Sequence, residues 1–206
     1  RDSESPMKLY YFPVATNPTK VLVYLKEINI DIDLQLVDLL QGEQKSAEHQ
    51  ARNPLRALQV LELDSGECLT ESLPIIEYLE ELYPEPVMIG ATPLERVRTR
   101  VFERQIELGI MNPLARYVHA TNSPLGLPPR PEVAATELDR LQAALPRVDE
   151  QIGDSPFAAG DAPSIVDCTL YAALLFGEMF GTTIPEQWSN IQRWKKAFSE
   201  RPSAQL

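Results

Sequence analysis

Residues 71–83 read Glu-Ser-Leu-Pro-Ile-Ile-Glu-Tyr-Leu-Glu-Glu-Leu-Tyr, and this stretch predicts a helix whose first turn is suited to an anion. Pro74 falls in that first turn, where its missing N–H costs nothing. The backbone N–H groups and the hydroxyl at Glu71-Ser72 lie at the positive end of the helix dipole, which favours a carboxylate. Most Ser residues at such a place are caps, so a second role needs support from the rest of the chain. Four apolar residues recur at three- and four-residue spacing and form one face of the helix: Leu73, Ile76, Leu79 and Tyr83.

The composition is that of a globular protein without a membrane-spanning segment. The chain has 206 residues, of which 44% are apolar and 24% charged, and no apolar run has the length of a membrane span. A net charge of -11 disfavours nucleic acid and anionic lipid as partners. Cys68 and Cys168 lie far apart and in no metal-ligand spacing, so we expect no metal and a reducing, cytoplasmic setting. Residues 1–6 are left out of the fold.

The first 84 residues alternate strand and helix signals. Strands are predicted at residues 8–12 and 33–39, with a helix from Asn17-Pro18 between them and a weak helix at residues 46–52. Residues 60–63 and 68–70 flank a Gly-containing turn and predict a hairpin. Together with the helix at residues 71–83, they predict an α/β domain over residues 7–84, followed by a linker at 85–93.

Residues 94–206 predict helices only. Thr92-Pro93-Leu94-Glu95 and Ser164-Ile165-Val166-Asp167 are capping boxes that each start a helix. Core candidates on the first of these helices are Val97, Val101 and Leu108. Asn112-Pro113 predicts a kink, and an amphipathic helix over residues 134–152 is expected to bend at Pro146. Residues 168–180 are apolar on almost every face, which marks a buried central helix and makes Cys168 a core residue. The last helix is predicted near residues 187–200.

An α/β domain followed by a helical one, with Glu-Ser opening a helix after a hairpin, resembles the cytosolic glutathione transferase superfamily. The resemblance covers residues 7–206 and rests on motifs that are individually weak but specific in this order. It implies a thioredoxin-like N-terminal domain, an all-α C-terminal domain, glutathione as cosubstrate, a homodimer and a role in detoxification. Residues 42–45, 92–95 and 119–129 look most like a bacterial and fungal branch that often lacks the usual catalytic residue. The motifs are Asn53-Pro54, residues 60–63, Leu69-Thr70-Glu71-Ser72, residues 158–161 and Ser164-Ile165-Val166-Asp167.

The same resemblance implies which residues meet glutathione. Glu71 and Ser72 would hold its γ-glutamyl end, in agreement with the anion site predicted from the residues themselves. Leu58, with Gln59 beside it, would offer backbone N–H and C=O groups to the cysteinyl part. Gln44 and Lys45 lie where the glycyl carboxylate is usually met, although Lys45 also fits an ordinary solvated lysine. Arg52 and Arg56 are weaker candidates for that carboxylate.

Activation of the glutathione thiol is where this chain departs from the family. The position that matches the usual catalytic Ser is Ala15, which cannot donate a hydrogen bond. Thr16 and Asn17 come next and could favour a thiolate, although Asn17 is equally well interpreted as a helix cap. In the similar branch, a water held by residues of the helical domain has been proposed to replace the missing side chain. His119 and Ser123 lie in the matching region, although a lone His at a helix end is more often a cap or surface residue.

A second departure precedes the third strand, where the family has a cis-proline and this chain has Gln59. A cis bond costs about 2.5 to 4 kcal/mol before a residue other than proline, so we expect a trans Leu58-Gln59 bond and a remodelled loop. Arg56 replaces a common Gly in the same loop.

Three hypotheses follow for the function. The first is a glutathione transferase that activates the thiol for attack on a small electrophile, or for a reductive or isomerising step. The electrophile would lie in a cleft between the domains, near Val14, Met111, Tyr117, His119 and Ser123. The second is a non-catalytic binding or regulatory protein of the same fold with a weakened glutathione site. The third, a thiol-disulfide oxidoreductase, is disfavoured because neither cysteine lies in the loop after the first strand.

Overall fold

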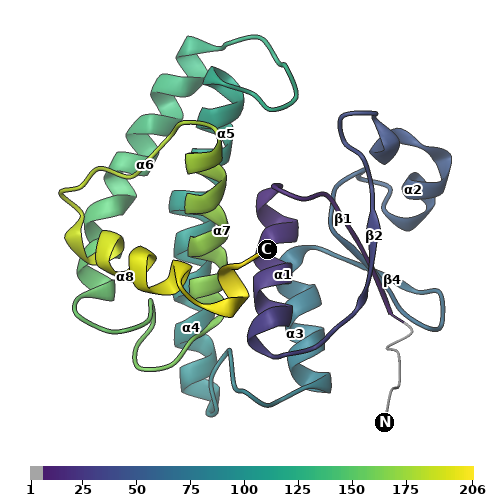
Figure 1. Cartoon of the computed structure of the whole chain (residues 1–206), viewed down its shortest axis with the longest axis horizontal. Coiled ribbons are helices and arrows are strands. Elements are labelled where there is room, and N and C mark those ends of the chain that lie inside the picture. The colour runs from purple at the N-terminus through teal and green to yellow at the C-terminus, as the bar shows by residue number, and fades with distance from the viewer. Residues whose placement is uncertain (1–6) are drawn as a thin grey trace. The chain divides into compact units, whose positions relative to one another are not determined.

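Four short strands form a mixed sheet in the computed structural model of the protein, which describes residues 7–206 (Figure 1). β1 pairs in parallel with β2 and antiparallel with β3, and β3 pairs antiparallel with β4. The crossover through a helix makes the first pair parallel, and the tight turn after β3 makes the last pair the predicted hairpin. In sheet order the strands are β2 (Asp33–Leu36), β1 (Lys8–Tyr11), β3 (Val60–Glu62) and β4 (Cys68–Thr70).

Helices cover both faces of this sheet (Figure 1). α1 (Thr16–Glu27) and α3 (Ser72–Leu82) pack together on one face, where the Tyr24 hydroxyl donates to Glu80 at 2.7 Å. The short η1 (Glu43–Lys45) and α2 (Ala47–Arg52) lie on the other face, and the Ser46 hydroxyl caps α2 by accepting from the His49 N–H. The weak helix predicted at residues 46–52 is therefore present.

The chain divides into two compact units between Pro86 and Val87. The first is thioredoxin-like and the second is all helical, as predicted. Within residues 7–206, no helix has the length and apolar character needed to cross a bilayer. The second unit contains α4 (Pro93–Ile106), the π-helical turn η2 (Glu107–Met111), α5 (Asn112–Thr121), α6 (Pro131–Ile152), α7 (Ile165–Met179), α8 (Ser189–Ser199) and η3 (Pro202–Ala204).

The π-helical turn lies at the break predicted from Asn112-Pro113. Here the Asn112 N–H bonds to the Glu107 carbonyl, five residues back instead of four, and α5 begins directly afterwards. Pro113 has no N–H to give to the helix ladder, which is consistent with a change of hydrogen-bond spacing at this point.

The Asp167 carboxylate holds the start of the buried helix α7. It accepts hydrogen bonds from the Ala158 N–H at 2.7 Å, the Ser164 N–H at 2.9 Å, the Ser164 hydroxyl at 3.0 Å and the Trp194 indole N–H at 2.7 Å. Burial raises the pKa of Asp167, whereas these four donors oppose that shift. The carboxylate thus ties the start of α7 to the preceding loop and to α8.

The exposed face of α4 corrects one prediction. Val97, Val101 and Leu108 are 55%, 50% and 59% exposed, so they do not belong to the core of the chain. The buried residues of α4 include Phe102 and Ile106, which are also spaced as one helical face. Both sets fit a helical period, so spacing alone could not decide which face the protein buries.

Candidate functional site

The N-terminus of α3 joins the start of α1 through one side-chain hydrogen bond. Ser72 is buried, and its hydroxyl donates to the Asn17 side-chain oxygen at 3.2 Å. Glu71 is the N-cap residue, with an exposed side chain that makes no capping bond and a φ of 70°. Such a φ is uncommon outside glycine and is found disproportionately at ligand sites. Ser72 therefore does not cap α3, and the interpretation of its hydroxyl as a cap is wrong.

Gln59 lies behind this contact and is almost fully buried. In the amide orientation that its neighbours require, its oxygen accepts from the Ser72 N–H at 2.8 Å and its nitrogen donates to the Asn17 carbonyl at 3.2 Å. Three segments distant in sequence thus meet: the first turn of α1, the loop before β3 and the first turn of α3. The sequence contained no signal for this cluster beyond the unexpected residue at position 59.

The anion site at this helix start is smaller than the sequence suggests. The Ser72 N–H is taken by Gln59, and Pro74 has no N–H. The Leu73 N–H makes no hydrogen bond to another described residue. A carboxylate approaching α3 would therefore meet the Leu73 N–H, helped by the helix dipole, and would receive the Ser72 hydroxyl proton only if that hydroxyl turned from Asn17 to the ligand.

The start of α1 also differs from prediction. Ala15 is the N-cap residue and has no side chain with which to cap, while Thr16 and Asn17 are the first two residues of the helix. The interpretation of Asn17 as the cap of α1 is therefore wrong, because its side chain instead accepts from Ser72. Val14, immediately before, has a φ of 83°, which is rare for a β-branched residue. This segment follows β1 directly, at the place expected for thiol activation.

Hydrogen bonds fix the loop before β3 at two residues, Ala57 and Gln59. The Ala57 carbonyl accepts from the His49 ring at 3.1 Å and from the Asn53 amide at 3.1 Å, while Gln59 is bonded to Asn17 and Ser72. The Leu58-Gln59 peptide bond is cis, so the prediction of a trans bond is wrong. Local propensity favoured trans, and the contacts of His49, Asn53 and Gln59, which residue-by-residue reasoning missed, determine the loop instead.

The predicted glycyl contacts lie in η1 and are not joined to the cluster by any hydrogen bond among the described residues. The Gln44 side-chain oxygen is buried and has no hydrogen-bond partner, whereas Lys45 is exposed. Arg56 is exposed, with a φ of 57° and a long contact of 3.4 Å to Gln50. The Leu58 backbone N–H and C=O make no hydrogen bond to another described residue, which leaves both available to a ligand.

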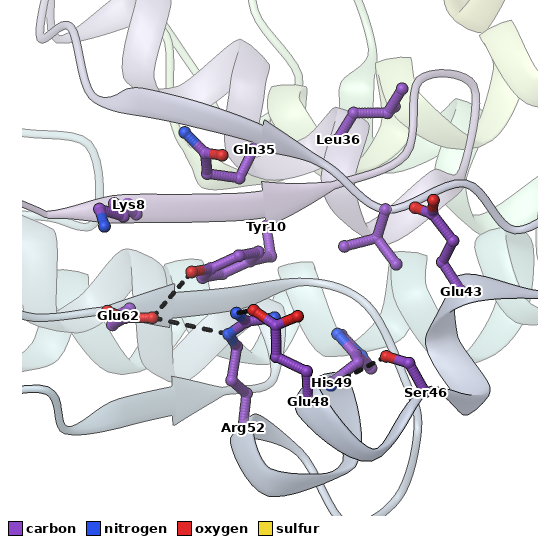
Figure 2. Close-up of a pocket in the computed structure, with 11 residues that line it drawn as sticks. Lys8, Tyr10, Gln35, Leu36, Glu43, Ser46, Glu48, His49, Arg52 and Glu62 are labelled. Carbon is purple, nitrogen blue, oxygen red and sulfur yellow. Dashed lines mark hydrogen bonds and ion pairs between the residues drawn. The ribbon is translucent and has the colours of Figure 1, made fainter.

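A cavity of about 600 Å³ lies between α2 and the sheet (Figure 2). Its lining does not include Asn17, Gln59 or Ser72. Arg52 is stacked over the Tyr10 ring at 4.0 Å, pairs with Glu48, and lies 3.6 Å from Glu62, which also accepts from the Tyr10 hydroxyl at 2.9 Å. These contacts occupy the Arg52 charge, so its proposed role toward the glycyl carboxylate loses support. The cavity is lined by Lys8, Tyr10, Gln35, Leu36, Val37, Glu43, Ser46, Glu48, His49, Arg52 and Glu62.

In the helical unit, His119 and Ser123 form a pair. The His119 Nδ1 lies 3.0 Å from the Ser123 hydroxyl oxygen, and this oxygen accepts from the Leu125 N–H. Burial lowers the pKa of His119, and the positive charge of Arg130 lowers it further. At neutral pH the imidazole is therefore uncharged and can accept a hydrogen bond.

The other predicted substrate contacts differ in exposure. Met111 is fully buried, whereas Val14 and Tyr117 are partly exposed. Neither cysteine is placed for redox chemistry: Cys168 is buried in α7, and burial raises the pKa of the partly exposed Cys68 thiol, which disfavours the reactive thiolate. Among residues 7–206, no cluster of three or more His, Cys, Asp or Glu side chains is placed to hold a metal ion.

Two family models match the two units. Residues 9–87 match the N-terminal domain of glutathione S-transferase, and residues 110–202 match its C-terminal domain. Glutathione S-transferase 2 of Saccharomyces cerevisiae is 30% identical over 203 residues, which span 96% of this chain and 87% of the yeast protein. Maleylacetoacetate isomerase of Pseudomonas aeruginosa is 29% identical over 197 residues, which span 91% of this chain and 88% of that enzyme.

A solved structure agrees with these matches along nearly the whole chain. The crystal structure of Gtt2 from Saccharomyces cerevisiae superposes with a TM-score of 0.88 at 29% identity, covering 96% of this chain and 98% of that one. Fold, domain order and sequence thus point the same way, and the chain belongs to the cytosolic glutathione transferase superfamily.

Proposed function

We propose that the protein is a glutathione transferase that binds glutathione at the first turn of α3 and adds its thiol to a small electrophile. The observation that carries this proposal is the joined start of α1 and α3. Asn17 and Ser72 are hydrogen-bonded at 3.2 Å, directly beside the exposed Glu71 carboxylate and a Leu73 N–H that has no partner among residues 7–206. A γ-glutamyl group carries one carboxylate and one ammonium, so it needs one positive and one negative contact, and this turn offers both.

Thiol activation is assigned to groups other than a side chain at position 15. Thr16 opens α1, and the Thr16 and Asn17 backbone N–H groups make no backbone hydrogen bond within residues 7–206, so we assign these groups to the sulfur. The uncharged His119, paired with Ser123, could orient a water as the acceptor of the thiol proton. Each group would favour the thiolate, which is the reactive form.

The experiment is an assay of conjugation with a generic aromatic electrophile such as 1-chloro-2,4-dinitrobenzene, with glutathione varied at fixed electrophile. We expect saturation in glutathione and a rate above the uncatalysed reaction. The Ser72→Ala variant should raise the KM for glutathione, whereas Ser199→Ala, at the far end of α8, should not. A protein that neither accelerates conjugation nor saturates with glutathione would contradict the proposal.

The second candidate is a non-catalytic protein of the same fold, and the absence of a side-chain donor at Ala15 favours it. Turnover distinguishes the two candidates, because a non-catalytic module gives none. Such a module also binds glutathione weakly or not at all. We further propose a homodimer, a cytoplasmic location and a role in detoxification. The two free cysteines support the location, since reducing compartments keep thiols unpaired.

A further inference from the structure

The Gln59 side chain bonds to the first turns of both α1 and α3. Its amide oxygen accepts from the Ser72 N–H at 2.8 Å, and its amide nitrogen donates to the Asn17 carbonyl at 3.2 Å. The side chain is 1% exposed, so water does not compete for these bonds. Both polar ends of the amide are thus used inside the protein.

This arrangement excludes one role for Gln59 and suggests another. The Gln59 side chain is buried and bonded at both ends of its amide, so we assign it an internal role in place of the direct contact with glutathione that the resemblance implies. Its partners, however, are the backbones of the two residues that are joined by the Ser72–Asn17 bond at 3.2 Å. With the Ser72 N–H turned inward to Gln59, two donors can serve a ligand at this turn: the Leu73 N–H, and the Ser72 hydroxyl once it turns from Asn17 to the ligand.

We propose that Gln59 is a positioning residue that fixes the first turn of α3 against α1 and so sets the position of the two donors that receive the γ-glutamyl carboxylate. This inference rests on the proposed function. It differs from a general packing role in one respect: removing the Gln59 amide should weaken recognition of the γ-glutamyl group more than it weakens recognition of the rest of the thiol substrate.

The test compares glutathione with cysteinylglycine, which has the same thiol but lacks the γ-glutamyl group. For the wild-type protein and Gln59→Met, kcat/KM is measured for both thiols with one aromatic electrophile. We expect the ratio of the two values to fall roughly tenfold in Gln59→Met, the effect of about one lost hydrogen bond. The matched control is Gln192→Met in the helical unit. It removes the hydrogen bond of 2.7 Å that the Gln192 side-chain amide donates to the Ile184 carbonyl, and it should leave the ratio unchanged.

A second measurement needs no variant. Amide hydrogen exchange of the ¹⁵N-labelled wild-type protein reports on the Ser72 N–H, which should be protected because Gln59 accepts from it, while the Leu73 N–H should exchange faster. A Ser72 amide that exchanges as fast as Leu73, or an unchanged thiol ratio in a folded Gln59→Met protein, overturns the inference while the proposed function stands. A wild-type protein that does not use glutathione overturns both.

Discussion

At the scale of single residues, the distinctive feature of the site is Ala15, which has no hydroxyl to donate to the glutathione thiol. Ala15 is the N-cap of α1 and has an extended backbone with a ψ of 137°, the conformation in which Ser usually caps. The chain therefore keeps the backbone arrangement for a hydroxyl but not the hydroxyl. We propose that thiol activation comes from Thr16, the start of α1 or His119.

Replacing Ala15 by Ser should restore a donor at this place. We expect Ala15→Ser to lower the apparent pKa of the acid limb of kcat/KM, because a hydroxyl donating to sulfur stabilises the thiolate. It should also raise stability by about 1 kcal/mol if the new side chain caps α1. A pH–rate profile and urea unfolding separate these effects. An unchanged profile would show that the sulfur does not lie beside Ala15.

His119 supplies the second residue-scale prediction. Its folded pKa lies below the usual 6.5, because burial and Arg130 both disfavour the charged form. The imidazole is therefore a neutral acceptor from pH 6.5 upward and loses this capacity only at lower pH. In His119→Ala, the apparent pKa of the acid limb of kcat/KM should rise toward the value of about 8.5 for a free thiol.

The control for this variant is Thr121→Ala, which changes the same turn of α5 but leaves the His119–Ser123 pair in place. If His119→Ala leaves both the rate and the pH profile unchanged, His119 has no part in activation, and Thr16 with the start of α1 becomes the remaining candidate.

At the scale of elements, the two capping boxes share one motif but differ in burial. The Thr92 and Glu95 pair is exposed at the start of α4, whereas Ser164 and Asp167 are buried at the start of α7. Sequence shows both helix starts, but it does not show that Asp167 also accepts from Ala158 and Trp194.

The difference in depth predicts a difference in stability. Asp167→Ala would leave several buried donors without an acceptor and should cost about 3 to 5 kcal/mol of unfolding free energy. Thr92→Ala removes one exposed cap and should cost about 1 kcal/mol. Urea unfolding followed by tryptophan fluorescence measures both, since Trp194 lies at the Asp167 site. Equal losses would contradict the account of Asp167 as the anchor of α7.

Sequence could predict the features that depend on neighbouring residues, but not those that depend on contacts between distant parts of the chain. The helix over residues 71–83, the hairpin and both capping boxes depend on neighbours within a few positions, and all are present. The contacts of Gln59 with Asn17 and Ser72 join positions 42 and 13 residues apart, and no local pattern encodes them. The buried face of α4 depends on what packs against it, which is why Val97 and Leu108 were misplaced.

At the scale of the whole molecule, the exposed face of α4 supports the proposed homodimer. Leu94, Val97 and Val101 of α4 and Leu108 of η2 are exposed, and the last three of these line a groove of about 510 Å³. Exposed apolar stripes of this kind usually meet another chain.

We expect the wild-type protein to sediment as a dimer and the double variant Val97→Glu with Leu108→Glu to sediment as a monomer, because two charges would be buried without partners. The control is Met179→Glu, which adds a charge to an exposed apolar residue at the end of α7. A wild-type monomer, or a double variant that stays dimeric, would contradict this use of α4.

The proposed function depends on glutathione binding at the first turn of α3. Isothermal titration of reduced glutathione into the wild-type protein and into Ser72→Ala tests this most directly. We predict saturable binding of one glutathione per chain, and an affinity about tenfold or more lower in Ser72→Ala, because a hydrogen bond to a carboxylate is lost. No binding by the wild-type protein, or equal affinity in the two proteins, would contradict the central claim.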